Sequence, residues 1–331
     1  MERVLTRDVK SHAGKRVLVR GWLHKKRLIG GINFILLRDR GGVVQVVVQD
    51  EAELEKLRSL QIGTVLAVEG DAVEEGRAPG GAEIHEPRIT VEVPVTDEPI
   101  IEIDKPLSHK HENLDTLFDY RHLGLRNLKE QEVFKIRAAL VRRIREYLTQ
   151  NEFTEIHTPK LLAGATEGGA EVFKTDYFGK EATLAQSPQL YKQMLVGAFE
   201  RVYEIAPAFR AEPSATTRHM SEVYMLDIEM GFINGLDDVL NTVQDMTHYA
   251  LIKIYGECAE ELKNWEAPEL VLKEKFPRYT VAEVHELYTK ATGTDTTHEK
   301  DLIPDEERWI CEHAKKEQGC EAVFVTHFPK E

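Results

Sequence analysis

The stretch RVYEIAPAFRAEPSATTRHMSEVYMLDIEMGF, residues 201–232, constrains the fold of this chain more than any other. Its first arm alternates with the two-residue period of a β-strand. One face receives Tyr203, Ile205, Pro207 and Phe209, and the other receives Glu204, Arg210 and Glu212. The polar stretch PSATTRHMS predicts a turn that carries Arg218 and His219. The returning arm places Asp227 and Glu229 on one face, with apolar Leu226, Ile228 and Met230 around them. The pattern predicts a long β-hairpin on which cations and carboxylates converge.

Two interpretations of this hairpin are open on its residues alone. An arginine can hold a phosphate through two parallel hydrogen bonds, so Arg210 on the strand and Arg218 with His219 at the turn would suit the two ends of a polyphosphate. Alternatively, the charges line a solvated sheet face and pair with one another, as they do in many charge-rich hairpins.

The order of residues resembles motif 2 of class II aminoacyl-tRNA synthetases, most closely the aspartyl enzymes. Nothing after the hairpin resembles the large inserted domain of the bacterial aspartyl enzymes, so the likeness is to the archaeal and eukaryotic type. The shared features are Phe-Arg-x-Glu, a polar loop with Arg-His, and a returning Asp-x-Glu. In that family the hairpin holds a bent ATP. The resemblance implies that Arg210 is catalytic and grips the α-phosphate, and that Glu212 binds the adenine amino group. It assigns the β- and γ-phosphates to Arg218 and His219. Val223 departs from the pattern, because many relatives have an aromatic residue there, which implies weaker stacking on adenine.

Composition and cysteine usage exclude several classes of protein. No run of 18 or more apolar residues occurs, and the N-terminal MERVLTRDVK lacks the apolar middle of a signal peptide, so a cytoplasmic protein is expected. Cys258, Cys311 and Cys320 form no CxxC pair, so neither a disulfide framework nor a zinc site is predicted. Cys311, His313 and Cys320 lack the spacing of metal ligands.

The net charge of −14 is unevenly distributed along the chain. Residues 1–50 hold 11 Lys or Arg against 4 Asp or Glu, whereas the rest of the chain is acidic. A basic module at the front of an acidic chain is typical of a protein that meets a phosphate backbone at one end. A small domain that is basic by chance is the alternative.

The same module predicts a five-stranded barrel. Short β-branched runs between Gly-rich or polar turns predict strands at 16–23, 32–38, 43–49, 64–70 and 88–95. Residues 51–60 form a short amphipathic helix, at the place where OB-folds commonly have one. We therefore predict an N-terminal OB-fold domain at residues 1–96.

Residues suited to single-stranded nucleic acid gather in this module. Lys25, Lys26 and Arg27 form a basic run, and Phe34 and Gln45 follow on neighbouring strands. A ring stacks on a splayed base, an amide reads a base edge, and cations neutralise phosphate. A strand phenylalanine is more often a core residue, so that alternative stays open. The spacing from GWLHKKR through INF to VVQV resembles the anticodon-binding domain of class IIb synthetases. The resemblance implies that Arg27, Phe34 and Gln45 contact the anticodon, with Phe34 stacking on its central uridine and Gln45 reading that base.

A long helix is predicted after the barrel. Residues 97–120 break the strand rhythm and are predicted to form a hinge, before a catalytic domain at residues 121–331. Apolar residues then recur at helical spacing and predict a helix of about five turns: Val133, Ile136, Leu140, Ile144 and Leu148. The strand that follows is predicted to end at Pro159, which suits an edge strand. This arrangement resembles motif 1, which implies a homodimer formed through the helix and the strand near Pro159.

Two segments have the composition of an amino-acid site. Glu167 precedes a Gly-Gly pair whose permissive backbone suits a moving lid. Residues 184–196 begin as a strand and continue as a helix, with Ser187 as its cap and Pro188 at its first position. Gln189 and Lys192 share one face of that helix, and a buried lysine beside an amide suits a carboxylate, although an isolated lysine is more often exposed. By resemblance, Glu167 lies near the substrate ammonium group, and Gln189 and Lys192 form the aspartate pocket.

The remaining residues predict helices at 236–265, 281–292 and 305–320 and a short apolar strand within 321–331. The predicted fold class is α+β, an OB-fold barrel followed by a class II antiparallel-sheet domain with flanking helices. Relatives continue with acidic magnesium ligands and a motif 3 that this sequence does not contain. The catalytic domain is therefore expected to be incomplete at its C-terminal end, with slow adenylate formation by the 331-residue chain.

The resemblance implies a ligase that uses ATP and magnesium to form aspartyl-adenylate and transfers aspartate to tRNA(Asp). Charging of tRNA(Asn) as well is left open. A catalytically impaired tRNA-binding paralogue is the alternative from another class. An asparagine-forming relative is a third, although such an enzyme has no use for an anticodon module.

Overall fold

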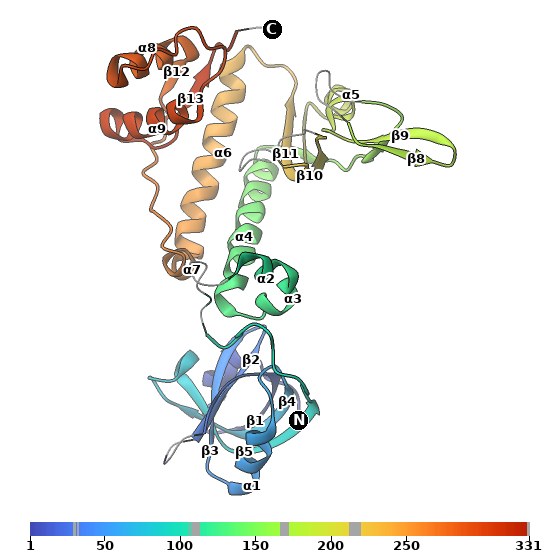
Figure 1. Cartoon of the computed structure of the whole chain (residues 1–331), viewed down its shortest axis with the longest axis vertical. Coiled ribbons are helices and arrows are strands. Elements are labelled where there is room, and N and C mark those ends of the chain that lie inside the picture. Colours follow the sequence, from blue (N-terminus) through green and yellow to red (C-terminus); the bar gives the residue numbers. More distant parts are fainter. Residues whose placement is uncertain are drawn as a thin grey trace. The chain divides into compact units, whose positions relative to one another are not determined.

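The computed structural model describes residues 1–28, 31, 33–105, 107, 113–165, 172–211 and 220–329 (Figure 1). The chain forms two compact units, Met1–Phe134 and Lys135–Glu331, and each is considered by itself. Within the described ranges, none of the helices is both long enough and apolar enough to cross a membrane.

The first unit contains a closed barrel in the order β1-β2-β3-β5-β4, which confirms the predicted OB-fold (Figure 1). Its strands are β1 (Arg16–Arg27), β2 (Asn33–Asp39), β3 (Gly42–Val48), β4 (Val65–Glu74) and β5 (Ala82–Val93). The short helices are η1 (Thr6–His12), α1 (Glu51–Ser59) and η2 (Pro79–Gly81). Alternate strand residues, such as Ile35 and Leu37, fill the barrel and are fully buried. β4 and β5 run beyond their predicted limits because they pair antiparallel along most of their length, apart from two shifts of register.

The segment after the barrel has a small core of its own. Ile101, Leu107 and Leu117 pack together, and each is no more than 5% exposed. α2 (Leu114–Asp119) and α3 (Arg121–Gly124) follow. Over its described part, the segment predicted to be a hinge therefore contains a small packed core, and its role as a hinge stays a prediction.

The second unit is built around the predicted hairpin. β10 (Arg201–Phe209) and β11 (Glu222–Met230) pair antiparallel, with Glu204 opposite Asp227. β6 (Thr154–Glu155) pairs parallel with β10, so the sheet has the order β11-β10-β6. The face that carries Tyr203 and Leu226 packs against residues of α4 (Leu128–Gln150) and α6 (Leu236–Glu257). The predicted division of the hairpin into an apolar and a polar face is confirmed.

The prediction of a strand that ends at Pro159 is wrong, because β6 ends at Glu155. Three residues later, the backbone N–H and the hydroxyl of Thr158 donate to the Glu204 side chain rather than to a strand. Pro159 has no N–H to continue the ladder. At Thr158, a side-chain carboxylate therefore accepts the backbone N–H that a continuing strand would donate to its neighbour.

A second small sheet lies before α5 and has the order β7-β9-β8. Its strands are β7 (Leu161–Leu162), β8 (Lys174–Tyr177) and β9 (Lys180–Leu184), and α5 spans Gln189–Phe199. The predicted cap of α5 is wrong by one residue. Pro188 occupies the cap position, and the Ser187 hydroxyl accepts the backbone N–H of Gln189 at 3.2 Å.

The C-terminal part contains α7 (Ala259–Asn264), β12 (Arg278–Thr280), α8 (Val281–Thr292), α9 (Pro304–Gln318) and β13 (Phe324–Thr326). The predicted helix at 236–265 is interrupted at Cys258, which leaves the helical conformation between α6 and α7. Glu306 on α9 is fully buried and accepts from Thr296 Oγ1, from His285 Nδ1 at 2.7 Å and from the backbone of Ile303. All three cysteines are free, and the described residues hold no cluster of three or more potential metal ligands.

Candidate active site and nucleic-acid interface

A buried lysine from α5 lies against the polar face of the hairpin. Lys192 projects from α5, and its side chain is only 7% exposed. Its ammonium group lies 2.8 Å from Asp227 Oδ1 and 3.6 Å from Glu229 Oε2, both on β11. The cation expected from the sequence is therefore buried, and two carboxylates of the hairpin hold it. Gln189, one helical turn earlier, is partly buried.

Glu204 on β10 stands opposite Asp227 on β11, and Glu204 is 2% exposed. Its carboxylate accepts from Thr158 N at 2.7 Å, from Thr158 Oγ1 at 2.8 Å and from Lys160 Nζ at 2.7 Å. Sequence reasoning placed Glu204 on the polar face but did not find this lysine partner. The Thr-Pro-Lys sequence after β6 carries no local signal for a partner that lies 44 residues away along the chain.

Small side chains occupy the polar face between Glu204 and Arg210. Ala206 and Ala208 lie there by the two-residue alternation, opposite Met225 and Val223. About 20 Å of backbone separates Glu204 from Arg210 at ~3.3 Å per residue. Arg210 is partly buried, and its Nε has no hydrogen-bond partner within the described part of the chain. The middle of the polar face is therefore lined by small and apolar side chains, with Lys192 towards one end and the Arg210 guanidinium at the other.

Four predicted site residues, Glu167, Glu212, Arg218 and His219, lie outside the described residues.

On the apolar face of the hairpin, Tyr203 makes a hydrogen bond to the neighbouring strand β6. Tyr203 Oη donates to Glu155 Oε2 at 3.0 Å, and burial together with this carboxylate raises the pKa of Tyr203.

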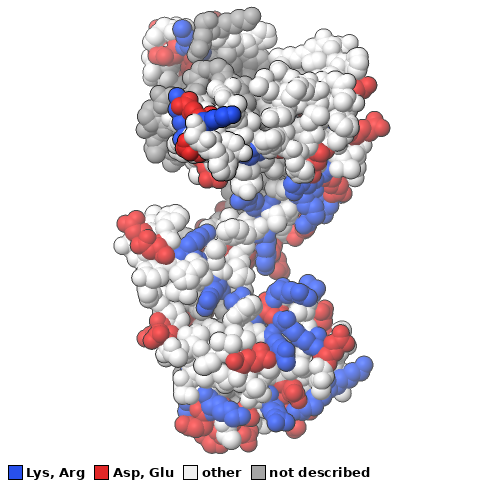
Figure 2. Space-filling model, turned by 90° about the vertical axis from the view of Figure 1, so that its right-hand side faces the viewer, with Lys and Arg blue, Asp and Glu red and all other residues white. Residues whose placement is uncertain are grey.

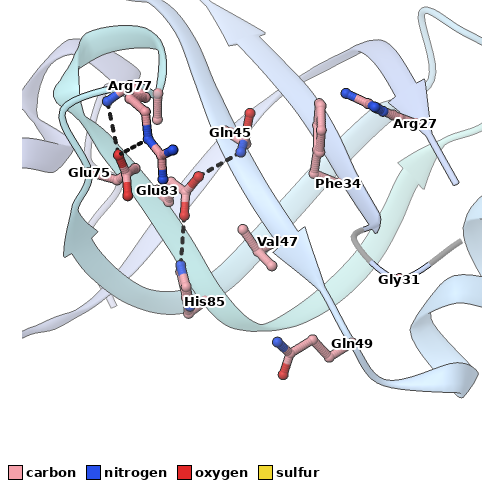
Figure 3. A pocket seen from close by; sticks show the side chains of 11 residues that line it. Arg27, Gly31, Phe34, Gln45, Val47, Gln49, Glu75, Arg77, Glu83 and His85 are labelled. Carbon is pink, nitrogen blue, oxygen red and sulfur yellow. Dashed lines mark hydrogen bonds and ion pairs between the residues drawn. The ribbon is translucent and has the colours of Figure 1, made fainter. Parts of the chain in front are cut away.

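The barrel carries a separate groove with a volume of about 720 Å³ (Figure 3). Arg27 on β1, Phe34 on β2 and Gln45 on β3 all line it, so the structure brings the three predicted anticodon residues together. The Arg27 guanidinium carbon lies 5.7 Å from the centroid of the Phe34 ring. Phe34 is only partly buried and is not a member of the barrel core, which contains its neighbour Ile35. The position of Phe34 therefore favours a stacking platform over a core residue.

β5 supplies part of the groove that the sequence did not indicate. Glu83 accepts from Gln45 Nε2 at 2.6 Å, and its second oxygen lies 2.8 Å from His85 Nε2 (Figure 3). Gln49 and Arg77 also line the groove. Nothing in the local pattern of β5 marks Glu83, because its partner Gln45 is 38 residues away along the chain. The contact uses the amide nitrogen of Gln45, so the carbonyl oxygen of this side chain takes no part in it.

The three basic residues at the end of β1 differ in exposure and in what their side chains contact. Lys25 and Arg27 are exposed, whereas Lys26 donates to backbone carbonyls at the end of α1, including Leu57 O at 3.1 Å. Burial lowers the pKa of Lys26. Residues 1–96 together hold 15 Lys or Arg against 14 Asp or Glu, and both signs are interspersed over the lower part of Figure 2. The basic excess of the first strands is therefore offset by acidic residues of α1, β4 and β5.

Comparison with protein families matches residues 113–331 to tRNA synthetases class II (D, K and N) and residues 17–92 to the OB-fold nucleic acid binding domain. The chain belongs to the class II tRNA synthetases of this group. It is 40% identical to the aspartate–tRNA(Asp/Asn) ligase of Thermus thermophilus, over 99% of this chain and 75% of the relative. It is 41% identical to the enzyme of the same name from Methanopyrus kandleri, over 96% and 73%.

Among solved structures, the chain is similar to asparaginyl-tRNA synthetase from Pyrococcus horikoshii complexed with asparaginyl-adenylate. The TM-score is 0.85 at 32% identity, over 95% of this chain and 72% of that one. The chain thus spans about three quarters of the length of its relatives.

Proposed function

We propose that this protein is an aspartate–tRNA ligase, which activates L-aspartate with ATP and transfers it to tRNA(Asp). The observation that carries this proposal is the match, at 37–41% identity over nearly the whole chain, to relatives named aspartate–tRNA(Asp/Asn) ligase. The geometry of the hairpin supports it, because a buried lysine suits the side-chain carboxylate of aspartate better than a neutral amide.

In the proposed activation step, the α-carboxylate oxygen of aspartate attacks the α-phosphorus of ATP, and pyrophosphate leaves with the electron pair of the broken bond. Lys192 holds the side-chain carboxylate, Gln189 donates beside it, and Asp227 keeps the ammonium group of Lys192 in place. Arg210 stabilises the charge that develops on the α-phosphate. Holding both reactants on one rigid sheet supplies the orientation that the reaction requires.

In the second step, a ribose hydroxyl of the tRNA attacks the carbonyl carbon of aspartyl-adenylate, and AMP leaves. ATP is a substrate here, and magnesium is the ion that the family implies. The described residues offer no cluster of three or more potential ligands for that ion, so no step is assigned to it.

The groove on the barrel is the proposed anticodon site. Arg27 neutralises phosphate, Phe34 stacks on an unpaired base and Gln45 accepts from the edge of that base. We also propose tRNA(Asn) as a second substrate, since several relatives carry both tRNAs in their names. A further relative, an aspartate–tRNA(Asp) ligase from Pyrococcus horikoshii, is named for tRNA(Asp) alone. Charging of the two tRNA transcripts side by side tests this point.

We further propose a homodimer formed through α4. Val133 and Phe134 on this helix are 44% and 49% exposed, whereas Ala139, further along the same helix, is buried in a core cluster. Adjacent large apolar side chains left exposed to solvent are typical of a protein–protein interface. Sedimentation equilibrium of the protein and of Phe134→Glu tests the proposal. A wild-type monomer at all concentrations would reject it.

The function itself is tested by two measurements. Isothermal titration with a non-hydrolysable aspartyl-adenylate analogue should show binding at least tenfold tighter than with the asparaginyl analogue, because only the aspartyl analogue offers Lys192 a charged substrate side chain. Aspartate-dependent ATP–pyrophosphate exchange then separates an active ligase from a binding-only paralogue. Equal affinity for both analogues would reject the proposed amino-acid specificity.

A further inference from the structure

Two carboxylates on the polar face each hold a lysine from a different segment. Glu204 and Asp227 stand directly opposite each other on β10 and β11. Asp227 holds Lys192 of α5 at 2.8 Å, and Glu204 holds Lys160, which lies between β6 and β7, at 2.7 Å. The Lys160 side chain is 22% exposed and the Glu204 side chain 2% exposed, so solvent screens this second pair only weakly.

The segment that Glu204 holds also supports α5. The Lys160 carbonyl accepts the backbone N–H of Ala185 at 2.9 Å, and the Ala185 carbonyl accepts the N–H of Phe209 at the end of β10. α5 begins four residues after Ala185 and carries Lys192. A continuous set of contacts therefore runs from Glu204 through Lys160 to the helix that presents Lys192.

The described ion pairs on this face join three carboxylates to two lysines, so negative charge already exceeds positive charge before a substrate arrives. Within the part of the chain that the structure describes, Glu204, Asp227 and Glu229 face Lys160 and Lys192. An anionic substrate side chain adds another negative charge. The Cα atoms of residues directly opposite in an antiparallel pair lie roughly 5 Å apart, and both side chains leave the sheet on the same face. Two carboxylates placed in this way repel each other when no cation compensates them. Without Lys160, the negative charge of Glu204 would act on the site of Lys192.

We propose that Lys160 and Glu204 form a charge-balancing positioning pair for the aspartate site. Neither residue is a catalytic residue. Lys160 neutralises Glu204, so that the positive charge of Lys192 remains available to the substrate carboxylate, while the backbone hydrogen bonds of Lys160 and Ala185 hold the segment that leads to α5. This proposal rests on the proposed function and adds two residues to its amino-acid specificity.

The test compares Lys160→Met, Glu204→Gln and the double variant, with the aspartyl- and asparaginyl-adenylate analogues as probes. Lys160→Met should weaken the aspartyl analogue at least tenfold and the neutral asparaginyl analogue by less than threefold. The double variant removes both charges and should return to within threefold of wild type for the aspartyl analogue. Lys174→Met removes a lysine from the exposed Lys174–Glu181 pair and should change neither affinity.

The selectivity between the two analogues provides a readout that a merely structural role would not move. A loss of packing in Lys160→Met would weaken both analogues alike, whereas an unbalanced negative charge on Glu204 weakens the anionic aspartyl analogue more than the neutral asparaginyl analogue. If Lys160→Met does not fold, Glu204→Gln alone remains informative, because it should keep aspartyl affinity within threefold of wild type.

The outcomes are distinguishable. A wild-type protein that binds neither analogue rejects the proposed function and, with it, this inference. A wild-type protein that prefers the aspartyl analogue, combined with a Lys160→Met variant that weakens both analogues equally or neither, overturns the inference alone. A double variant as weak as Lys160→Met also overturns it.

Discussion

Replacement of Lys192 by methionine is the sharpest test of the amino-acid site. Methionine keeps the length and much of the volume of the side chain but removes its charge. The Lys192 side chain is 7% exposed, and the ammonium group that the substitution removes lies 2.8 Å from Asp227 and 3.6 Å from Glu229. A bound aspartate side chain would then lie beside two carboxylates without a cation between them.

The magnitude follows from the burial of this pair. Breaking a buried ion pair by removing one partner costs about 3–5 kcal/mol, because the remaining charge is left without compensation. At about 1.4 kcal/mol per tenfold, the affinity for the aspartyl-adenylate analogue should fall by roughly 10²- to 10⁴-fold. Asp227 and Glu229 are 14% and 29% exposed, so water can reach them, and the free energy of unfolding should fall by less, about 1–3 kcal/mol.

Isothermal titration with the two adenylate analogues, together with thermal melting of the free protein, separates these effects. Lys174→Met, which breaks the Lys174–Glu181 pair with both side chains more than 60% exposed, is the matched control and should change stability by no more than about 1 kcal/mol. A loss of aspartyl affinity below tenfold in Lys192→Met, with the fold intact, would mean that the substrate carboxylate binds elsewhere.

Three further predictions concern the barrel and the C-terminal helices. Phe34→Ala should weaken binding of a tRNA(Asp) anticodon stem-loop by about 1–3 kcal/mol in a fluorescence titration, with little change in melting temperature. Ile35 lies inside the barrel, so Ile35→Ala should instead lower the free energy of unfolding by about 2–5 kcal/mol. The reverse pattern would make Phe34 a core residue. Arg27→Met should reduce the salt dependence of stem-loop binding by about one unit of slope, and an unchanged slope would exclude a phosphate contact. Desolvation raises the pKa of Glu306, but the hydrogen bonds from Thr296, His285 and the Ile303 backbone outweigh desolvation, so the pKa of Glu306 is lowered in the folded protein. The ionised carboxylate therefore stabilises the fold above pH 4.5, and this stabilisation is lost as the pH falls through the folded-state pKa. Glu306→Gln should therefore cost about 1–3 kcal/mol at pH 7 and flatten the acid limb of a urea-unfolding series, whereas the exposed Glu317→Gln should do neither.

The elements that the sequence predicted well are those whose signal is local. α8 spans the predicted residues 281–292, because Thr280 and Glu283 cap each other's backbone N–H groups and apolar residues recur behind them. The two faces of the hairpin follow in the same way from strict alternation along β10. Each of these signals lies within a few residues, so it can be read before any tertiary contact is known.

The features that only the tertiary structure decided depend on partners far away in the chain. Lys26, which looked like part of a phosphate-binding run, donates instead to carbonyls at the end of α1, more than thirty residues away. Glu83 holds Gln45 across 38 residues, and Glu204 holds Thr158 across 46 residues and Lys160 across 44. The sequence alone determined which side chains share a face, because that depends on the backbone period. It could not determine which buried charge meets which partner, because that depends on how the faces pack together.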